Sequence, residues 1–190
     1  MHPSMQRILL QPTLSALHVI YNVAVRNWLI LRQPVIPVLV VLTVISAATL
    51  AWYPFVHSDE VWLASLTLTM MEERSFAATE EFFVLTPRHP HAIKTFYHLI
   101  QMPFLAVDFS HVAARLPSAL AGLASVWFLY HIVASLSGRR VIAALTALAF
   151  GLDPQLLYIS HFARQEALVL AVTLGALAVL TRPAAGAREG

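Results

Sequence analysis

The 190-residue chain contains no cysteine and few charged residues, and each shortage excludes a class of protein. Without cysteine the chain can form neither a disulfide nor a thiolate metal site. Only 12% of its residues are charged, about half of the ~25% that is typical of a soluble domain. The formal net charge of +2 is too small and too dispersed to indicate a nucleic-acid partner.

Apolar residues are what the chain has instead: they make up 58% of it, and the mean hydropathy is +0.71. Residues 34–53 contain no ionisable side chain except Tyr53. At ~1.5 Å per residue this run is long enough to cross a hydrocarbon core of ~30 Å. Three further apolar runs occupy residues 116–136, 141–159 and 167–180, and Asp153-Pro154 breaks the second of these near one end. The sequence predicts an all-α, polytopic integral membrane protein with about four transmembrane helices.

The expected organisation has three parts. Residues 1–33 form a cytoplasmic or interfacial segment, within which an amphipathic interfacial helix is favoured over a true span for residues 8–31. Residues 34–181 form the transmembrane module, with an outer loop at 55–115, and residues 182–190 form a disordered tail. Inside the outer loop, helical spacing of apolar residues predicts two amphipathic helices on the outer leaflet, at residues 60–71 and 92–107.

The arginines set the expected orientation. By the positive-inside rule, segments rich in arginine face the cytoplasm. The loop 55–115 and the turn 160–165 then lie outside, and every acid except Glu189 is on or near that side. The arginines assigned to the cytoplasmic side are Arg7, Arg26, Arg32, Arg139, Arg140, Arg182 and Arg188.

Two adjacent acids, Asp59 and Glu60, follow the first apolar run at the expected membrane interface. A carboxylate there could act as a general base toward an acceptor hydroxyl, or bind a divalent cation. The alternative is helix capping, with Ser58 or Asp59 as the N-cap and Glu60 favouring the helix dipole. Capping and catalysis do not exclude each other.

Charged residues also flank two later runs on the same outer side. Glu166 opens the fourth run shortly after Arg164, and an acid entering a membrane helix is costly and usually functional or paired. Local charge balance between Arg164 and Glu166 is the alternative. Arg115 directly precedes the second run, where its guanidinium suits either the phosphate of a ligand or the phosphates of surrounding lipid.

Histidines gather on the outer side, where a His-x-His pair with nearby carboxylates could bind zinc. Histidines scattered over a solvated surface are the commoner arrangement, so a divalent metal stays an open question, with His57, Asp59 and Glu166 as weak candidate ligands. His131, deep in the second run, is expected to be an interhelical hydrogen-bond partner. The histidines on the outer side are His57, His89, His91, His98, His111 and His161.

Four segments occur in an order that resembles a known family. They are HSDEVWLA at 57–64, RHPHAIKTFYHLIQMP at 88–103, ARLPSALAGLASVWFLYHIVASLSGRR at 114–140 and ALAFGLDPQLLYISHFARQEALVLAVTL at 147–174. Together they resemble the N-terminal half of GT-C glycosyltransferases, and most of all the protein O-mannosyltransferases and aminoarabinose transferases. The resemblance covers residues 35–180.

The resemblance implies that a sugar is transferred from a polyprenyl-phosphate donor to an acceptor hydroxyl at the outer face of the plasma (inner) membrane. One of Asp59 and Glu60 is implied as catalytic base or metal-associated acid. Arg115 is implied to contact the lipid-linked phosphate, and Glu166 to lie in the same pocket. The family's His-Pro-Pro stretch is only partly kept, as His-Pro-His at residues 89–91. The candidate substrate-binding residues are Arg115, Arg164, Glu166 and His89.

The chain departs from these enzymes in length, because they have many more spans. We therefore expect it to work with a C-terminal half or a partner membrane subunit, besides its implied partners, a polyprenyl-phosphate-linked sugar and membrane lipids. The rival interpretation is a non-catalytic membrane protein, either a lipid-binding accessory subunit or a transporter fragment. An accessory subunit should tolerate the loss of Asp59, whereas an enzyme should not.

Overall fold

The computed structural model describes residues 33–76 and 95–181, and every regular element in these two ranges is an α-helix. The all-α prediction is therefore confirmed for the described residues. The predictions made for residues 1–32, for the loop 77–94 with His89 and His91, and for the tail 182–190 lie outside the described residues.

The described helices follow the predicted apolar runs closely. The predicted break at Asp153-Pro154 and the two predicted helices of the outer loop are all present. The helices are α2 (Val35–Thr49), α3 (Ser58–Glu72), α5 (Thr95–Val107), α6 (His111–Ser137), α7 (Arg140–Gly151), α8 (Pro154–Ser160) and α9 (Glu166–Leu180).

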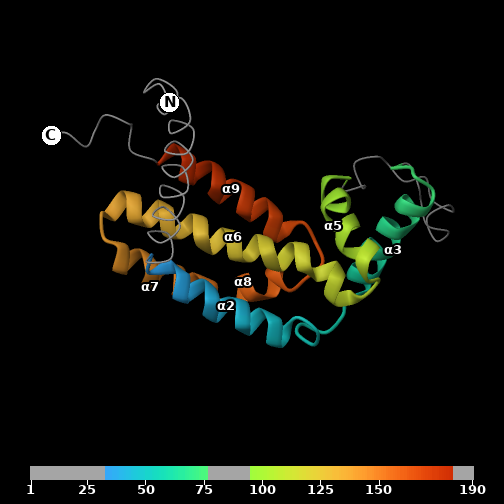
Figure 1. Cartoon of the computed structure of the whole chain (residues 1–190), viewed down its shortest axis with the longest axis horizontal. Coiled ribbons are helices and arrows are strands. Elements are labelled where there is room, and N and C mark those ends of the chain that lie inside the picture. The colour runs from blue at the N-terminus through green and yellow to red at the C-terminus, as the bar shows by residue number, and fades with distance from the viewer. Residues whose placement is uncertain (1–32, 77–94, 182–190) are drawn as a thin grey trace, which may run out of the picture.

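Helix α6 is the axis of the molecule. It runs lengthwise through the middle, with α9 along one side and α2 and α7 along the other (Figure 1). Helices α3 and α5 pack against each other and against the first turns of α6, so they form a separate cluster at one end. The described part of the outer loop is thus a small helical unit seated on the end of the bundle.

The bend between α7 and α8 has a local cause. Asp153 caps α8 by accepting hydrogen bonds from the backbone N–H groups of Gln155 (2.9 Å) and Leu156 (3.1 Å). Pro154 occupies the first turn of α8, where its missing N–H costs nothing. The two helix axes meet at 66°, and the chain turns back so that α8 packs against α6.

Small residues let the helices of the bundle approach one another closely at two places. Ala121 on α6 packs with Ala167 and Ala171 on α9. Gly122 faces α8 so closely that a Cβ built on it would lie 2.5 Å from the Cβ of Ser160. At these two contacts the small side chains let helix α6 approach α8 and α9 closely.

The expectation of four membrane spans is not confirmed by helix length in the described residues. Helix α6, with 27 residues, is long and apolar enough to cross a membrane, and the bent pair of α7 and α8 passes the same test as one unit. Helices α2 and α9 have 15 residues each, or ~22 Å, against a hydrocarbon core of ~30 Å. Helix α2 ends at Thr49, four residues before the end of the apolar run at Tyr53.

Candidate functional site

Glu60 and Arg115 form a buried ion pair where α3 meets the start of α6. Nε of Arg115 donates to Oε1 of Glu60 at 2.8 Å, and Nη2 donates to Oε2 at 2.7 Å. The side chain of Arg115 is 0% exposed and that of Glu60 is 2% exposed. Two parallel bonds between a planar guanidinium and a carboxylate are the strongest form of this contact.

Arg115 also holds the chain segment that leaves α2. Nη1 donates to the carbonyl oxygens of Leu50 (2.8 Å) and Tyr53 (3.3 Å), and Nη2 donates to that of Pro54 (2.9 Å). A guanidinium has five N–H groups, and all five of Arg115 are directed at protein acceptors. In this structure Arg115 has no donor left over for a phosphate.

Glu60 is equally saturated. Besides the two bonds from Arg115, its Oε1 accepts from the backbone N–H of Ala163 at 2.8 Å, and its Oε2 accepts from the backbone N–H of His57 at 3.1 Å. The N-cap of α3 is His57, whose Nδ1 accepts from the backbone N–H of Asp59 at 3.2 Å. The prediction that Ser58 or Asp59 is the N-cap is therefore wrong, because the helix already begins at Ser58, one residue before a Ser58 cap would allow and two before an Asp59 cap would allow. The side chain of Glu60 completes the cap by accepting from the backbone N–H of His57.

A second, more accessible charge cluster lies next to this pair. Nη1 of Arg164 is 3.3 Å from Oδ2 of Asp59, and Nη2 is 3.0 Å from Oε1 of Glu166. The side chains are 41% (Asp59), 31% (Arg164) and 40% (Glu166) exposed. The expected charge balance between Arg164 and Glu166 is present, and Arg164 also reaches Asp59 on another helix. The cluster therefore offers one cation and two carboxylates, with a formal charge of −1, to the solvent.

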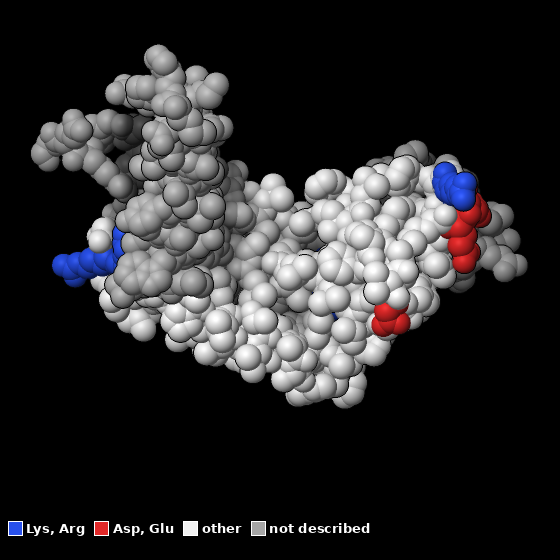
Figure 2. Space-filling model, in the orientation of Figure 1, with Lys and Arg blue, Asp and Glu red and all other residues white. Residues whose placement is uncertain are grey.

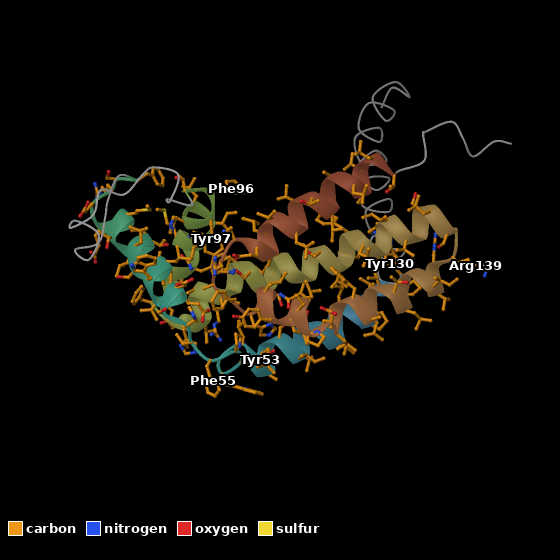
Figure 3. All side chains as sticks on the ribbon, turned by 180° about the vertical axis from the view of Figure 1, so that it is seen from behind. Tyr53, Phe55, Phe96, Tyr97, Tyr130 and Arg139 are labelled. Atoms are coloured by element: carbon orange, nitrogen blue, oxygen red, sulfur yellow. The ribbon has the colours of Figure 1, made fainter. Side chains whose placement is uncertain are left out.

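Two hydrogen bonds with neighbouring helices fix the turn at residues 160–165. Its backbone is fixed by the Ala163 bond to Glu60 and by a bond of 2.9 Å from the hydroxyl of Ser118 to the carbonyl oxygen of Arg164. The hydroxyls of Ser118 and Tyr97 are 3.2 Å apart, and Tyr97 lies on the part of α5 next to α6 (Figure 3). Burial raises the pKa of the Tyr97 hydroxyl well above its usual range, so the phenol keeps its proton. Arg164 is thus presented by a preorganised turn.

Two of the outer histidines are not on the solvated surface where they were expected, because His98 and His161 are fully buried. Nδ1 of His161 is 2.8 Å from the carbonyl oxygen of Leu157, and Nε2 is 3.0 Å from the hydroxyl of Thr49. A carbonyl only accepts, so Nδ1 carries the proton of the neutral ring. Burial lowers the pKa of His161 below its ordinary value of 6.5, which keeps the ring neutral at pH 7.

The core of the α3–α5 cluster contains a polar network that was not predicted from the sequence. The hydroxyl of Thr67 lies 2.7 Å from Nδ1 of His98 and 2.6 Å from Oε1 of Gln101. The amide of Gln101 donates to the carbonyl oxygen of Ala114 at 3.1 Å. In the sequence these three residues do not stand out, because α3 carries other polar side chains along its length. The network ties α3 and α5 to the start of α6, which is the element that carries Arg115.

The metal hypothesis finds no support in the described part of the chain, where no three His, Cys, Asp or Glu side chains come close enough to hold an ion. Two of the candidate ligands, Asp59 and Glu166, are both bonded to the guanidinium of Arg164. The third, His57, uses Nδ1 to accept the backbone N–H of Asp59. The site as described is built from ion pairs.

The comparison with known protein families bears on this arrangement directly. The family described as dolichyl-phosphate-mannose-protein mannosyltransferase matches residues 89–188, more than half of the 190 residues. The chain belongs to this family. No curated protein and no solved structure gives a significant match. The part that matches the family includes Arg115, Arg164 and Glu166, whereas Asp59 and Glu60 precede it, so their place in the site rests on the contacts described above.

Proposed function

We propose that this chain is a module of a membrane glycosyltransferase that moves a sugar from a polyprenyl-phosphate donor to an acceptor hydroxyl at the outer face of the membrane. Membership of the mannosyltransferase family supports the reaction class. The observation that carries the proposal is the pairing of Asp59 with Arg164. It places an accessible carboxylate and an accessible guanidinium 3.3 Å apart, above a buried ion pair that fixes both segments.

The proposed topology has α2, α6, α9 and the bent pair of α7 and α8 crossing the membrane together. Charge supports this placement. The junction of α6 and α7, which carries Arg139 and Arg140, lies at one end of the bundle, and α3 and the start of α9, which carry Asp59, Glu60 and Glu166, lie toward the other (Figure 1). Figure 2 shows basic side chains at the first of these ends and both acidic and basic side chains at the α3 end. The basic end then faces the cytoplasm, and the cluster of α3, α5 and the turn 160–165 faces outside.

Asp59 is the proposed general base. Its carboxylate is 41% exposed, so an acceptor hydroxyl can approach it. In the step, the acceptor oxygen forms a bond to the anomeric carbon while the bond from that carbon to the phosphate oxygen breaks. The hydroxyl proton passes to Asp59, and polyprenyl phosphate leaves with the electron pair. Glu60, with all its contacts made inside the protein, is a positioning residue rather than a second base.

Arg164 is the proposed phosphate contact, in preference to Arg115. Every N–H of Arg115 is committed to a protein acceptor, whereas the side chain of Arg164 is 31% exposed and pairs with two half-exposed carboxylates. A guanidinium whose partners are half-exposed carboxylates can exchange one of them for a phosphate at small cost, because such pairs contribute little. The phosphate then competes with Asp59 for Arg164, and donor binding releases the base.

The competition can be tested by measuring the affinity of the detergent-purified chain for polyprenyl phosphate. Arg164→Gln should weaken binding about tenfold or more, the effect of losing one charge-assisted contact. Asp59→Asn should strengthen binding up to about fivefold, because a competing partner of Arg164 is neutralised. Glu72→Gln, an exposed acid at the other end of α3, is the matched control and should change nothing. Unchanged affinity in Arg164→Gln would show that Arg164 does not contact the donor. The role of Asp59 as general base is tested separately, by measuring sugar transfer in Asp59→Asn.

A further inference from the structure

A cavity of about 610 Å³ lies at the end of the bundle opposite to the Asp59 cluster. It is formed where the chain enters α2, where α6 and α9 end and where α7 begins. Aromatic and small residues of α6 make much of its wall, and polar groups from Gln33 and Arg140 complete it. Six of the lining residues carry the argument: Gln33, Trp127, Tyr130, His131, Ala134 and Arg140.

The aromatic wall is rigid. The ring of His131 packs edge-on against Trp127, with 4.6 Å between ring centroids, and against Tyr130 at 5.1 Å. Tyr130 is 2% exposed and belongs to the main hydrophobic cluster of the bundle. Aromatic rings fixed in this way offer an apolar surface that needs no rearrangement to receive a ligand.

The polar groups of the cavity select the ligand's charge. Arg140 is exposed and has no acidic partner in the described part of the chain. It is the first residue of α7, so the positive end of that helix dipole lies at the same place. Together they favour a negatively charged group, and a phosphate fits the planar donors of a guanidinium.

Gln33 adds a second requirement. Its Oε1 is buried and has no hydrogen-bond partner in the described part of the chain. Leaving a buried acceptor without a hydrogen bond destabilises the protein, so a ligand that donates a hydrogen bond there binds more tightly. The ligand should therefore carry a hydroxyl or amine near its phosphate.

We propose that this cavity binds an anionic phospholipid of the cytoplasmic leaflet, with its phosphate at Arg140, a headgroup hydroxyl at Gln33 and the start of its acyl chains on the aromatic wall. The volume lies within the range of ligand pockets, ~300–1,000 Å³, and basic pockets at the cytoplasmic ends of membrane helices suit lipid headgroups. The proposal rests on the membrane orientation given above but not on sugar transfer.

The first test counts bound lipid by native mass spectrometry of the detergent-purified chain during titration with phosphatidylglycerol. Arg140→Gln should weaken binding about fivefold or more, the effect of one basic residue near an anionic lipid. The matched control is Arg139→Gln. Arg139 carries the same charge one residue earlier, at the same end of the bundle (Figure 3), and is not among the residues that line the cavity. Equal weakening by both variants would show that only general surface charge attracts lipid, and would overturn the proposal.

The second test addresses the headgroup and the source of the phosphate. Phosphatidylmethanol has the same charge as phosphatidylglycerol but no headgroup hydroxyl, so the wild-type chain should prefer phosphatidylglycerol, and Gln33→Leu should abolish that preference. Glycerol phosphate, which lacks acyl chains, should not compete; effective competition by it would assign the cavity to a soluble phosphate ester instead. Ala134→Phe fills the cavity and should abolish the phosphatidylglycerol complex while circular dichroism confirms that the helices are kept. Persistent binding in that variant would place the lipid elsewhere.

Discussion

Arg115 and Glu60 lie 55 residues apart in the sequence and meet through two hydrogen bonds of 2.8 and 2.7 Å, with both side chains almost fully buried. Their remaining bonds reach the end of α2, the cap of α3 and the turn before α9. One ion pair thus joins the three segments that surround Asp59 and Arg164. Its role is to hold the site in shape.

The first prediction concerns the stability of this pair. Arg115→Met leaves the carboxylate of Glu60 buried without its partner, and removing one member of a buried ion pair typically destabilises a protein by about 3–5 kcal/mol. Thermal unfolding of the detergent-solubilised chain, followed by circular dichroism, should show this loss. Asp59→Asn breaks only a half-exposed pair and should cost less than about 1 kcal/mol. A small effect of Arg115→Met would mean that the pair does not hold the site together.

The second prediction uses three glycines in helices as a graded series. Gly122→Ala should destabilise the fold by about 1–3 kcal/mol, because its Cβ would collide with Ser160 on α8. Gly151→Ala meets the two methyl groups and Cγ of the Leu42 side chain, which can shift more readily than the Cβ of Ser160, and it should cost less. Gly175→Ala meets the ring of Phe128 at 3.2 Å and should be nearly neutral, since alanine favours the helix by about 1 kcal/mol. An equal effect at all three positions would contradict the close contact of α6 and α8.

The third prediction is a pH dependence that arises from His161. Its pKa is lowered in the folded chain, so below pH ~6.5 the unfolded chain takes up a proton more readily than the folded one. Stability should fall as the pH drops below ~6.5, by at most about 1.4 kcal/mol per pH unit for one proton. His161→Gln keeps a hydrogen-bonding side chain but cannot titrate. Unfolding midpoints from pH 7.5 to 5 should therefore decline less steeply in that variant, and parallel curves would rule His161 out.

The fourth prediction concerns topology. The chain has no cysteine, so single cysteines report cleanly on accessibility. Phe109→Cys, on the exposed side of the outer cluster, should react with an impermeant thiol reagent in intact cells, whereas Arg139→Cys should react only after the membrane is opened. Labelling of position 139 but not of position 109 in intact cells would show that the chain has the opposite orientation, with the α3–α5 cluster in the cytoplasm.

The helices could be predicted from the sequence because each follows a local pattern. The bounds of α6 and α9 extend the predicted runs by only a few residues, and Asp153-Pro154 marks the break before α8. The number of membrane spans was harder to predict, because apolar composition alone does not show that α2 and α9 each end after 15 residues.

The site could be predicted only in part. The sequence identifies Asp59, Arg164 and Glu166 as charges at helix ends on one side, and the structure brings them together. It could not show that Glu60 turns inward to Arg115 while its neighbour Asp59 turns outward, because that depends on how α3 packs against α6. Adjacent residues on a helix point about 100° apart, and this rotation separates a buried positioning residue from an accessible carboxylate.

The central claim is that Asp59 accepts the proton of the acceptor hydroxyl, and its most direct test is sugar transfer by the Asp59→Asn chain. The assay uses native membranes in which the variant replaces the original copy, a radiolabelled polyprenyl-phosphate mannose at saturating concentration and the endogenous acceptors. Loss of a positioned general base should lower turnover about 10²–10⁴-fold, with donor binding no weaker than that of the wild type and the unfolding midpoint retained. Glu72→Gln membranes should transfer at the wild-type rate. Transfer by Asp59→Asn at a rate close to that of the wild type would contradict the account and favour a non-catalytic accessory subunit.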